Sequence, residues 1–184
     1  LGERVNDGAY STMIDRITSN TNPDFFFLSY EPKKQKVRSF VILPKHFFVP
    51  NIIEKRKPLA ETARRAGWTG CNILLNAVPA QGHIFVVQNG IVENREIVIA
   101  QLNRSCSLET SDVEARGWLF DVLNCVNAIA ADVFTLDKVY EFEPLLSAKH
   151  PENNNVKAKI RQQLQLLRDK GYIEFLTRGQ YRKI

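Results

Sequence analysis

The spacing of apolar residues in the last third of the chain constrains the fold more than any other feature. From residue 111 onward the apolar positions recur every three or four residues, as on one face of a helix: Leu119, Val122, Leu123, Val126 and Ile129. Ser111 followed three residues later by Glu114 matches a capping box, which predicts that this helix begins there.

Two further helices are predicted after the first. Thr135 is the expected N-cap of a helix that carries Leu136, Val139, Tyr140 and Phe142 and whose length Pro144 limits. The next helix follows Asn153–Asn155 and ends at Lys170, because Gly171 tolerates the left-handed backbone that closes a helix. A hairpin, Tyr172–Leu176 and Tyr181–Lys183 around the turn Thr177–Gln180, ends the chain. Three helices and a terminal hairpin form the order of a winged helix, a DNA-binding variant of helix-turn-helix.

The third helix has two chemically different faces. Its predicted core face consists of Val156, Ile160, Leu164 and Leu167. The opposite face carries groups that can read bases or touch phosphates in a major groove: Ala158, Arg161, Gln162, Gln165 and Asp169. We expect phosphates to be held by Lys157, Lys159, Arg178, Arg182 and Lys183. The alternative is a solvated surface helix with no ligand.

The first part of the chain has a different periodicity. Strands are predicted at Phe25–Tyr30, Ser39–Leu43, Ile73–Leu75 and Ile84–Gln88, with turns at Asn22-Pro23 and Asn89-Gly90. One early helix, Ala9–Ser19, would place Met13, Ile14 and Ile17 on one face. We therefore predict an α+β protein with a boundary near residue 110, giving domains 1–110 and 111–184.

The positive charge is concentrated in two segments. The net charge is +5, but residues 151–184 carry eight Lys or Arg against three acids, and residues 33–65 carry ten against two. A partner lined with phosphates is the simplest target for such patches. In the second segment Arg64 and Arg65 precede Trp68, which lies between Gly67 and Gly70. We expect the two arginines to hold a DNA backbone and the indole to pack on bases or their methyl groups; the alternative is a Trp that plugs the core.

Several functional classes find no support in the sequence. There is no apolar run long enough for a membrane span and no secretory signal, so an intracellular, cytoplasmic protein is expected. Cys71, Cys106 and Cys125 are scattered and odd in number, and we expect reduced, mostly buried thiols. The histidines are equally scattered, so we predict no metal site.

One nuclease-like pattern is present in letters only. Pro23-Asp24 with Glu31-Pro32-Lys33 matches the PD…(D/E)xK pattern of many DNA nucleases. The residues between them read as one extended strand, which would separate the carboxylates by roughly 20 Å, too far for one shared metal ion. We therefore expect no catalytic residue within this chain.

Long strings of the sequence identify a resemblance. The stretches NDGAY, NPDFFFLSY, RKPLAETARRAGWTGCNI, RGWLFDVLNC, IRQQLQLLRDKGYIEF and RGQYRKI resemble, in order and over nearly the whole chain, the DpnI-like methyl-directed type II restriction endonucleases. The resemblance implies a PD-(D/E)xK nuclease-type α/β domain, of which this chain holds the C-terminal part, followed by a winged helix.

The resemblance also implies an activity. Such enzymes cut duplex DNA at GATC when the adenine carries an N6-methyl group, and both domains read the site, with Trp68 at the position next to the adenine methyl groups. In the family the Mg²⁺-binding Asp, Glu and Lys and a four-cysteine zinc motif precede NDGAY. In this chain Asn6 begins that string, so we expect the chain alone to bind methylated DNA as a monomer without cleaving it. The alternative is a non-catalytic reader or regulator that binds methylated DNA.

Overall fold

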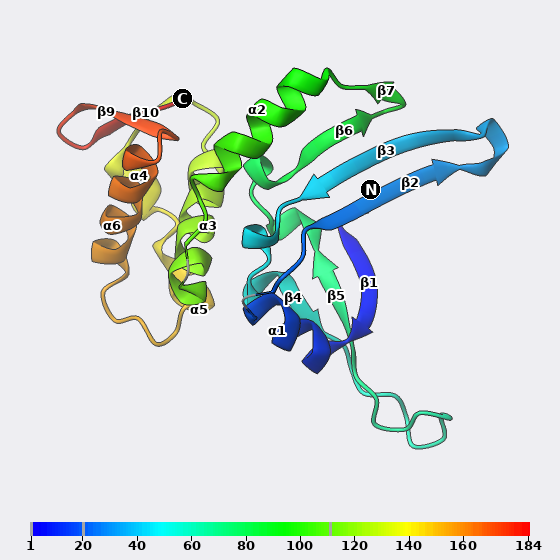
Figure 1. Cartoon of the computed structure of the whole chain (residues 1–184). Helices are drawn as coiled ribbons and strands as arrows, with labels where there is room; N and C mark the ends of the chain where they lie inside the picture. Colours follow the sequence, from blue (N-terminus) through cyan, green and yellow to red (C-terminus); the bar gives the residue numbers. More distant parts are fainter. Residues whose placement is uncertain (1, 20, 111) are drawn as a thin grey trace. The chain divides into compact units, whose positions relative to one another are not determined.

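The chain divides into two compact units, Leu1–Val113 and Glu114–Ile184. The computed structural model describes residues 2–19, 21–110 and 112–184 (Figure 1). Each unit is described by itself.

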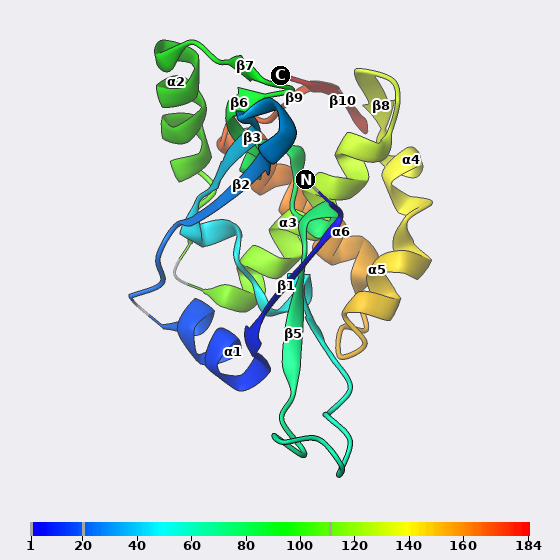
Figure 2. The same cartoon turned by 90° about the vertical axis from the view of Figure 1, so that its right-hand side faces the viewer.

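Two antiparallel sheets form the first unit. The larger has the order β2-β3-β6-β7, with β2 Phe25–Glu31, β3 Lys36–Leu43, β6 Ile84–Gln88 and β7 Ile91–Val92. The smaller has the order β1-β5-β4, with β1 Arg4–Ala9, β5 Gly70–Leu74 and β4 Ile53–Lys55. Helix α1, Tyr10–Thr18, lies beside β1 and β5 (Figure 2), and α2 spans Arg95–Cys106.

Most of the strand predictions in this unit are confirmed. The four predicted strands are β2, β3, β5 and β6, although Leu75 lies outside β5 and begins a 3₁₀ turn. Asn89 and Gly90 both have positive φ, 52° and 80°, as a tight hairpin turn between β6 and β7 requires. In α1, Met13 and Ile17 are buried and Ile14 is half-buried.

Helix α2 and strands β1, β4 and β7 were not predicted. Helix α2 buries only Val98 and Ser105, so it has no continuous apolar stripe for periodicity to detect. A cap signal was available, because the side chain of Asn94 accepts a 2.7 Å hydrogen bond from the backbone N–H of Glu96. Strand β1 is almost entirely exposed and has no alternation of apolar and polar residues.

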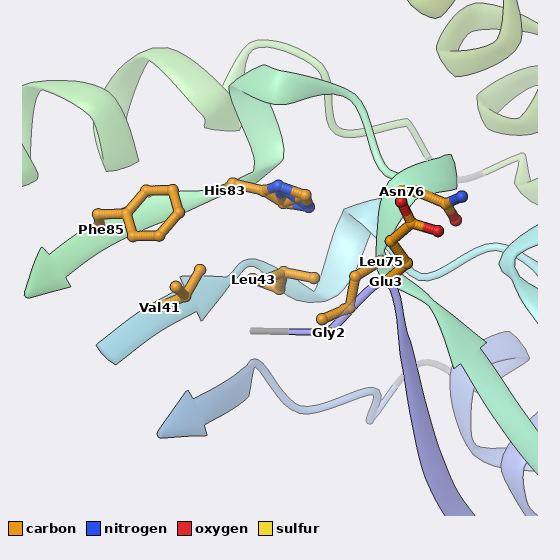
Figure 3. Close-up of a pocket in the computed structure, with 8 residues that line it drawn as sticks. All are labelled: Gly2, Glu3, Val41, Leu43, Leu75, Asn76, His83 and Phe85. Carbon is orange, nitrogen blue, oxygen red and sulfur yellow. The ribbon is translucent and has the colours of Figure 1, made fainter. Parts of the chain in front are cut away.

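A pocket of about 220 Å³ opens beside the larger sheet (Figure 3). Its walls come from β3, β6, the turn after β5 and the residues before β1: Gly2, Glu3, Val41, Leu43, Leu75, Asn76, His83 and Phe85. Burial lowers the pKa of His83, which favours the neutral ring. With Glu3 and no Lys or Arg in its lining, this pocket is poorly suited to phosphate.

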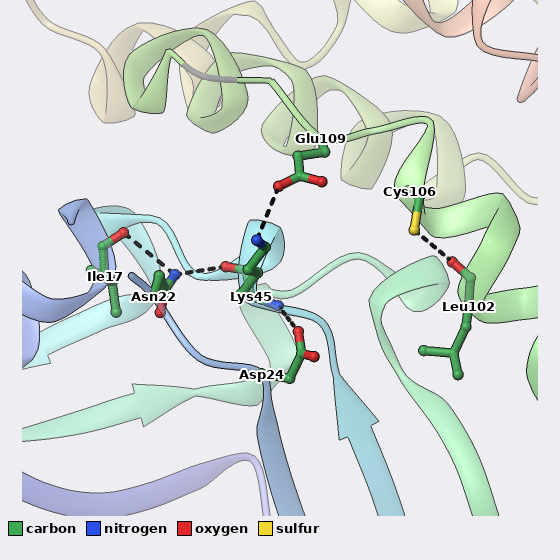
Figure 4. A network of polar contacts seen from close by, with 7 residues as sticks. All are labelled: Ile17, Asn22, Asp24, Lys45, Leu102, Cys106 and Glu109. Carbon is green, nitrogen blue, oxygen red and sulfur yellow. Dashed lines mark hydrogen bonds and ion pairs between the residues drawn. The ribbon is translucent and has the colours of Figure 1, made fainter. Parts of the chain in front are cut away.

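The nuclease-like pair of carboxylates is separated by the full length of β2. The carboxylate of Asp24 accepts a 2.8 Å hydrogen bond from the backbone N–H of Lys45 (Figure 4). Glu31, at the other end of β2, pairs with Lys34 at 2.8 Å, and this contact lowers the pKa of Glu31. Each acid therefore has its own local partner at its own end of the strand.

The second unit contains a bundle of helices with a small sheet. Its elements are α3 Val113–Ala128, β8 Val133–Thr135, α4 Leu136–Tyr140, α5 Glu143–Lys149, α6 Val156–Asp169, β9 Ile173–Thr177 and β10 Gln180–Lys183. The sheet has the order β8-β10-β9 and is antiparallel. This is the winged-helix order, and it includes a short strand, β8, that pairs with β10 of the wing and was not predicted.

Two predictions about this unit are wrong, the number of helices and the place of Phe142. Helix α4 ends before Pro144, as expected, but it ends at Tyr140, so Phe142 lies beyond it. Pro144 lies in the first turn of a separate helix, α5, where its missing N–H costs no hydrogen bond. Residues 112–184 as described thus contain four helices rather than three. Thr135 does cap α4, since its hydroxyl accepts a hydrogen bond from the N–H of Lys138 at 3.3 Å. The capping-box residue Ser111 lies outside the described residues.

The cysteines are not all buried. Cys71 and Cys125 are buried, and burial raises the pKa of Cys125 to about 12. Cys106, the last residue of α2, is exposed, so two of the three thiols are buried, in keeping with the expectation of mostly buried thiols. All three are free thiols.

Candidate nucleic-acid interface

Helix α6 has the two faces that its sequence predicts. Val156, Ile160, Leu164 and Leu167 are buried, the last three completely. The residues of the predicted reading face are all exposed: Ala158, Arg161, Gln162, Gln165 and Asp169. Gly171, with φ +75°, ends the helix as expected. The predicted base-reading residues therefore lie together on one exposed side of a helix anchored by its other side.

Two of the basic residues on α6 have contacts within the second unit. The Arg161 guanidinium donates a 2.7 Å hydrogen bond to the hydroxyl of Tyr140, and Lys157 lies 3.4 Å from a Glu143 carboxylate oxygen. The Lys157 ammonium also lies 5.4 Å from the centre of the Tyr140 ring. Tyr140 thus orients both cations, a role that the sequence reasoning missed although it had placed Tyr140 on the preceding helix.

A buried polar cluster holds the segment that leads into α6. Asp121 of α3, nearly inaccessible to solvent, pairs with Lys149 and lies 2.9 Å from Nε2 of His150. The His150 ring stacks on Trp118, with centroids 3.9 Å apart, and Lys159 lies over the same indole at 6.0 Å. A buried carboxylate is tolerated when it is paired and hydrogen-bonded, and Lys149 and His150 at the end of α5 both contact Asp121 of α3. Lys159 is accordingly half-buried, which makes it a weaker phosphate ligand than we expected.

The wing is a two-residue hairpin between β9 and β10. Arg178 and Gly179 form the turn, and Gly179 supplies the positive φ of +74°. Arg178 is exposed and makes no polar contact with the described residues. Arg182 instead forms a 2.7 Å ion pair with Glu174, its cross-strand partner, and Lys183 donates to the carbonyl of Ile129. Three cations of the wing were predicted to hold phosphates, and of these only Arg178 has no polar partner among the described residues.

In the first unit, the last part of the second basic segment lies in a long hairpin loop. We call residues 56–69, between β4 and β5, the basic loop; it projects beyond the ends of these strands (Figure 1). Its neck is held by backbone hydrogen bonds from Arg56 to Gly70 at 3.0 Å and from Leu59 to Trp68 at 2.9 Å. Arg64 and Arg65 are exposed near its tip, as are Arg56 and Lys57 at its base. Arg56 and Lys57 are also positively charged, although the sequence did not single them out as DNA-binding residues.

Trp68 lies neither in the core nor fully in solvent. It is half-buried, and its ring folds back on the neck of its own loop, against Gly70. The guanidinium of Arg65 lies 6.0 Å from the centre of the indole. The alternative of a Trp that plugs the core does not describe this position, because Trp68 is absent from the buried apolar residues.

Family models match both units in order. The model of the DpnI, or Dam-replacing, family matches residues 1–111, and that of the Dam-replacing helix-turn-helix domain matches residues 114–183. The chain belongs to the DpnI family. It is a methylation-dependent DNA-recognition protein with a nuclease-like first domain and a winged helix at its C-terminus.

The described residues give no candidate metal centre. No group of three or more His, Cys, Asp or Glu side chains among them is placed to bind an ion. In the same residues, no helix has the length and apolarity that a membrane span requires.

Proposed function

We propose that this DpnI-family chain recognises duplex DNA containing N6-methyladenine in GATC, as part of an endonuclease that cleaves the methylated site. The observation that carries the proposal is the exposed face of α6, where Ala158, Arg161, Gln162 and Gln165 lie together on a helix of a matched helix-turn-helix domain. Gln can contact adenine through two hydrogen bonds, Arg can contact guanine in the same way, and the Ala methyl group offers an apolar surface to a base methyl.

The cations around this face position the DNA. Lys157 lies in the first turn of α6, Arg178 in the turn of the wing and Arg182 in strand β10. Contacts of such residues to phosphates fix register and orientation but do not distinguish sequences. Among them we assign the larger share to Arg178, since Arg182 already pairs with Glu174.

The basic loop supplies the second contact in the proposal. Arg64 and Arg65 hold the DNA backbone, and the half-exposed ring of Trp68 packs against the adenine methyl groups. A methyl group in the major groove adds a small apolar surface, and its burial against a ring is worth about 0.8 kcal/mol. Discrimination between methylated and unmethylated DNA would then come from Trp68 and sequence discrimination from α6.

Hydrolysis is not assigned to the described residues. The Mg²⁺ that the family implies would need its carboxylate ligands close together around one ion, and Asp24 and Glu31 are held at opposite ends of β2 by partners of their own. The residues described here do not fit that ion, so the mechanism proposed for this chain is recognition.

Binding to four duplexes tests the proposal. The chain is titrated with GATC and with a scrambled site, each with and without N6-methyladenine, over a series of salt concentrations. If four to six basic groups meet phosphates, log K should fall with log salt at a slope of about −4 to −5. The methylated GATC duplex should bind most tightly at every salt concentration. Equal affinity for all four duplexes would reject the proposed specificity, and a slope near zero would reject DNA binding.

A further inference from the structure

We infer that Gly70 is a positioning residue for Trp68, and through Trp68 a determinant of methyl recognition. The role in methyl recognition rests on the proposed function. The positioning role, in which the missing side chain at position 70 sets the orientation of the indole, rests on the geometry of the basic loop alone.

The indole occupies the space that a side chain at position 70 would fill. A Cβ built on Gly70 would lie 2.8 Å from Cη2 and 3.0 Å from Cζ3 of Trp68. Folded proteins essentially never show contacts this short between a Cβ and another carbon. The six-membered ring of Trp68 therefore lies against the bare backbone of β5, and any larger residue at position 70 would displace it.

The backbone itself does not require glycine at this position. Gly70 is not among the residues with positive φ, and it pairs with Ala9 of β1, next to a register shift between Asp7 and Ala9 in the other strand. Its carbonyl accepts the 3.0 Å hydrogen bond from Arg56 that closes the neck of the loop, a bond that any residue could make. In a strand, glycine is less favourable than alanine, so its presence needs another explanation. The contact with the ring provides one.

An added Cβ at position 70 should displace the Trp68 side chain without disrupting the fold. The two short contacts are to the far edge of a ring that can rotate about two torsions, whereas the third neighbour, Cδ of Arg56, would lie at an ordinary 3.5 Å. Gly70→Ala should therefore swing the indole off the neck of the loop and leave the pairing of β4 with β5 intact.

The orientation of the ring has a consequence for binding. A ring held in place before DNA arrives loses little conformational entropy on contact, whereas a ring that rotates freely must be ordered at that moment. Gly70→Ala should thus lower the ratio of affinities for methylated and unmethylated GATC as far as Trp68→Ala does, about fourfold if one ring–methyl contact is lost.

Tryptophan fluorescence reads the orientation without DNA. The chain has only two tryptophans, and Trp118 is 1% exposed, so iodide quenching reports Trp68 almost alone. Gly70→Ala should increase quenching. Gly8→Ala is the matched control: Gly8 lies in the neighbouring strand β1, its φ is not positive, and an added Cβ would meet nothing within 4 Å. This control should leave both quenching and the affinity ratio unchanged.

A double-mutant cycle keeps the inference testable if Gly70→Ala proves unstable. With Trp68 present, Gly70→Ala should lower Tm. In the Trp68→Ala background the same substitution should leave Tm unchanged or raise it, because the obstructing ring is gone. An equal loss of Tm in both backgrounds would overturn the positioning role.

The results of these experiments distinguish the positioning role of Gly70 from methyl recognition by Trp68. Unchanged quenching and an unchanged affinity ratio in a folded Gly70→Ala variant would overturn the inference as a whole. If Trp68→Ala itself leaves the ratio unchanged, methyl reading by this residue fails, and quenching together with the Tm cycle still decides whether Gly70 positions the ring.

Discussion

Helix α6 and the basic loop present the same kinds of groups, arginines beside a residue able to read a base, but they hold them in different ways. On α6 the exposed residues are fixed by a buried stripe on the same helix, ending in the fully buried Leu164 and Leu167. In the basic loop no core residue anchors Trp68. Its ring rests on the backbone at Gly70, and a few backbone hydrogen bonds close the neck of the loop.

Because of this difference, the two regions should respond differently to substitution. Substitutions on the buried face of α6 should disrupt the whole interface, because the helix then loses its packing against the core. Substitutions in the basic loop should change one contact with DNA and leave the fold intact. Loops carried on a rigid scaffold commonly combine mobility with function in this way.

Leu164→Ala should cost about 2–5 kcal/mol of unfolding free energy, because it empties a completely buried site on α6. DNA binding by the second unit should fall with it. Chemical denaturation measures the loss, and the neighbouring exposed position Gln165→Ala is the control, expected within about 0.5 kcal/mol of the parent. Equal losses at both positions would contradict the assignment of the two faces.

Gln162→Ala should weaken binding to GATC by about 1–3 kcal/mol while affecting the scrambled site less, since base contacts carry sequence information. Arg161→Ala should have a similar effect. Tyr140→Phe removes only the 2.7 Å hydrogen bond that orients Arg161, so its loss should be smaller than that of Arg161→Ala. Competition binding measures all three, and identical losses on both sites would show that α6 touches only phosphates.

Arg178→Ala should make the salt slope shallower by about 0.9, the contribution of one phosphate contact. Arg182→Ala should change the slope less, because Arg182 is held by Glu174 at 2.7 Å. Titrations at a series of salt concentrations compare the two arginines. A larger change for Arg182 would mean that its ion pair opens on DNA.

Trp68→Ala should lower the preference for methylated over unmethylated GATC by about 0.8 kcal/mol. Affinity for the scrambled duplex should change little. Arg64→Ala and Arg65→Ala provide the contrast, since lost phosphate contacts weaken methylated and unmethylated DNA alike. If the preference survives in Trp68→Ala while Tm falls, the indole serves the stability of the loop rather than methyl recognition.

Regular features of the second unit could be predicted because short-range rules govern them. The buried stripe of α6 follows from helical spacing, the end of the helix from Gly171, and the turn of the wing from Arg178-Gly179. In the first unit, β6 and its Asn89-Gly90 turn follow from the same kind of local rule. Pro144 shows the limit of such rules, because it can either end a helix or begin one, and it begins α5.

The residues of the candidate interface could be named from the sequence, but which of their charged groups are already paired within the protein could not. Arg178 and Arg182 look equivalent in the sequence, and only the register of β9 with β10 places Glu174 opposite Arg182. Arg161 and its partner Tyr140 are 21 residues apart. The cluster of Asp121, Lys149 and His150 likewise joins positions that no local pattern connects.

The sequence by itself determined the family, the winged helix and the division of α6 into a buried and an exposed face. Helical periodicity and turn chemistry act over a few residues, and long identical strings identify relatives without any geometry. Only the tertiary structure decided which cations remain free and that Trp68 lies on Gly70 rather than in the core. Those outcomes depend on the packing of segments far apart in the chain or on the path of a loop, and such contacts are set by the whole fold rather than by neighbouring residues.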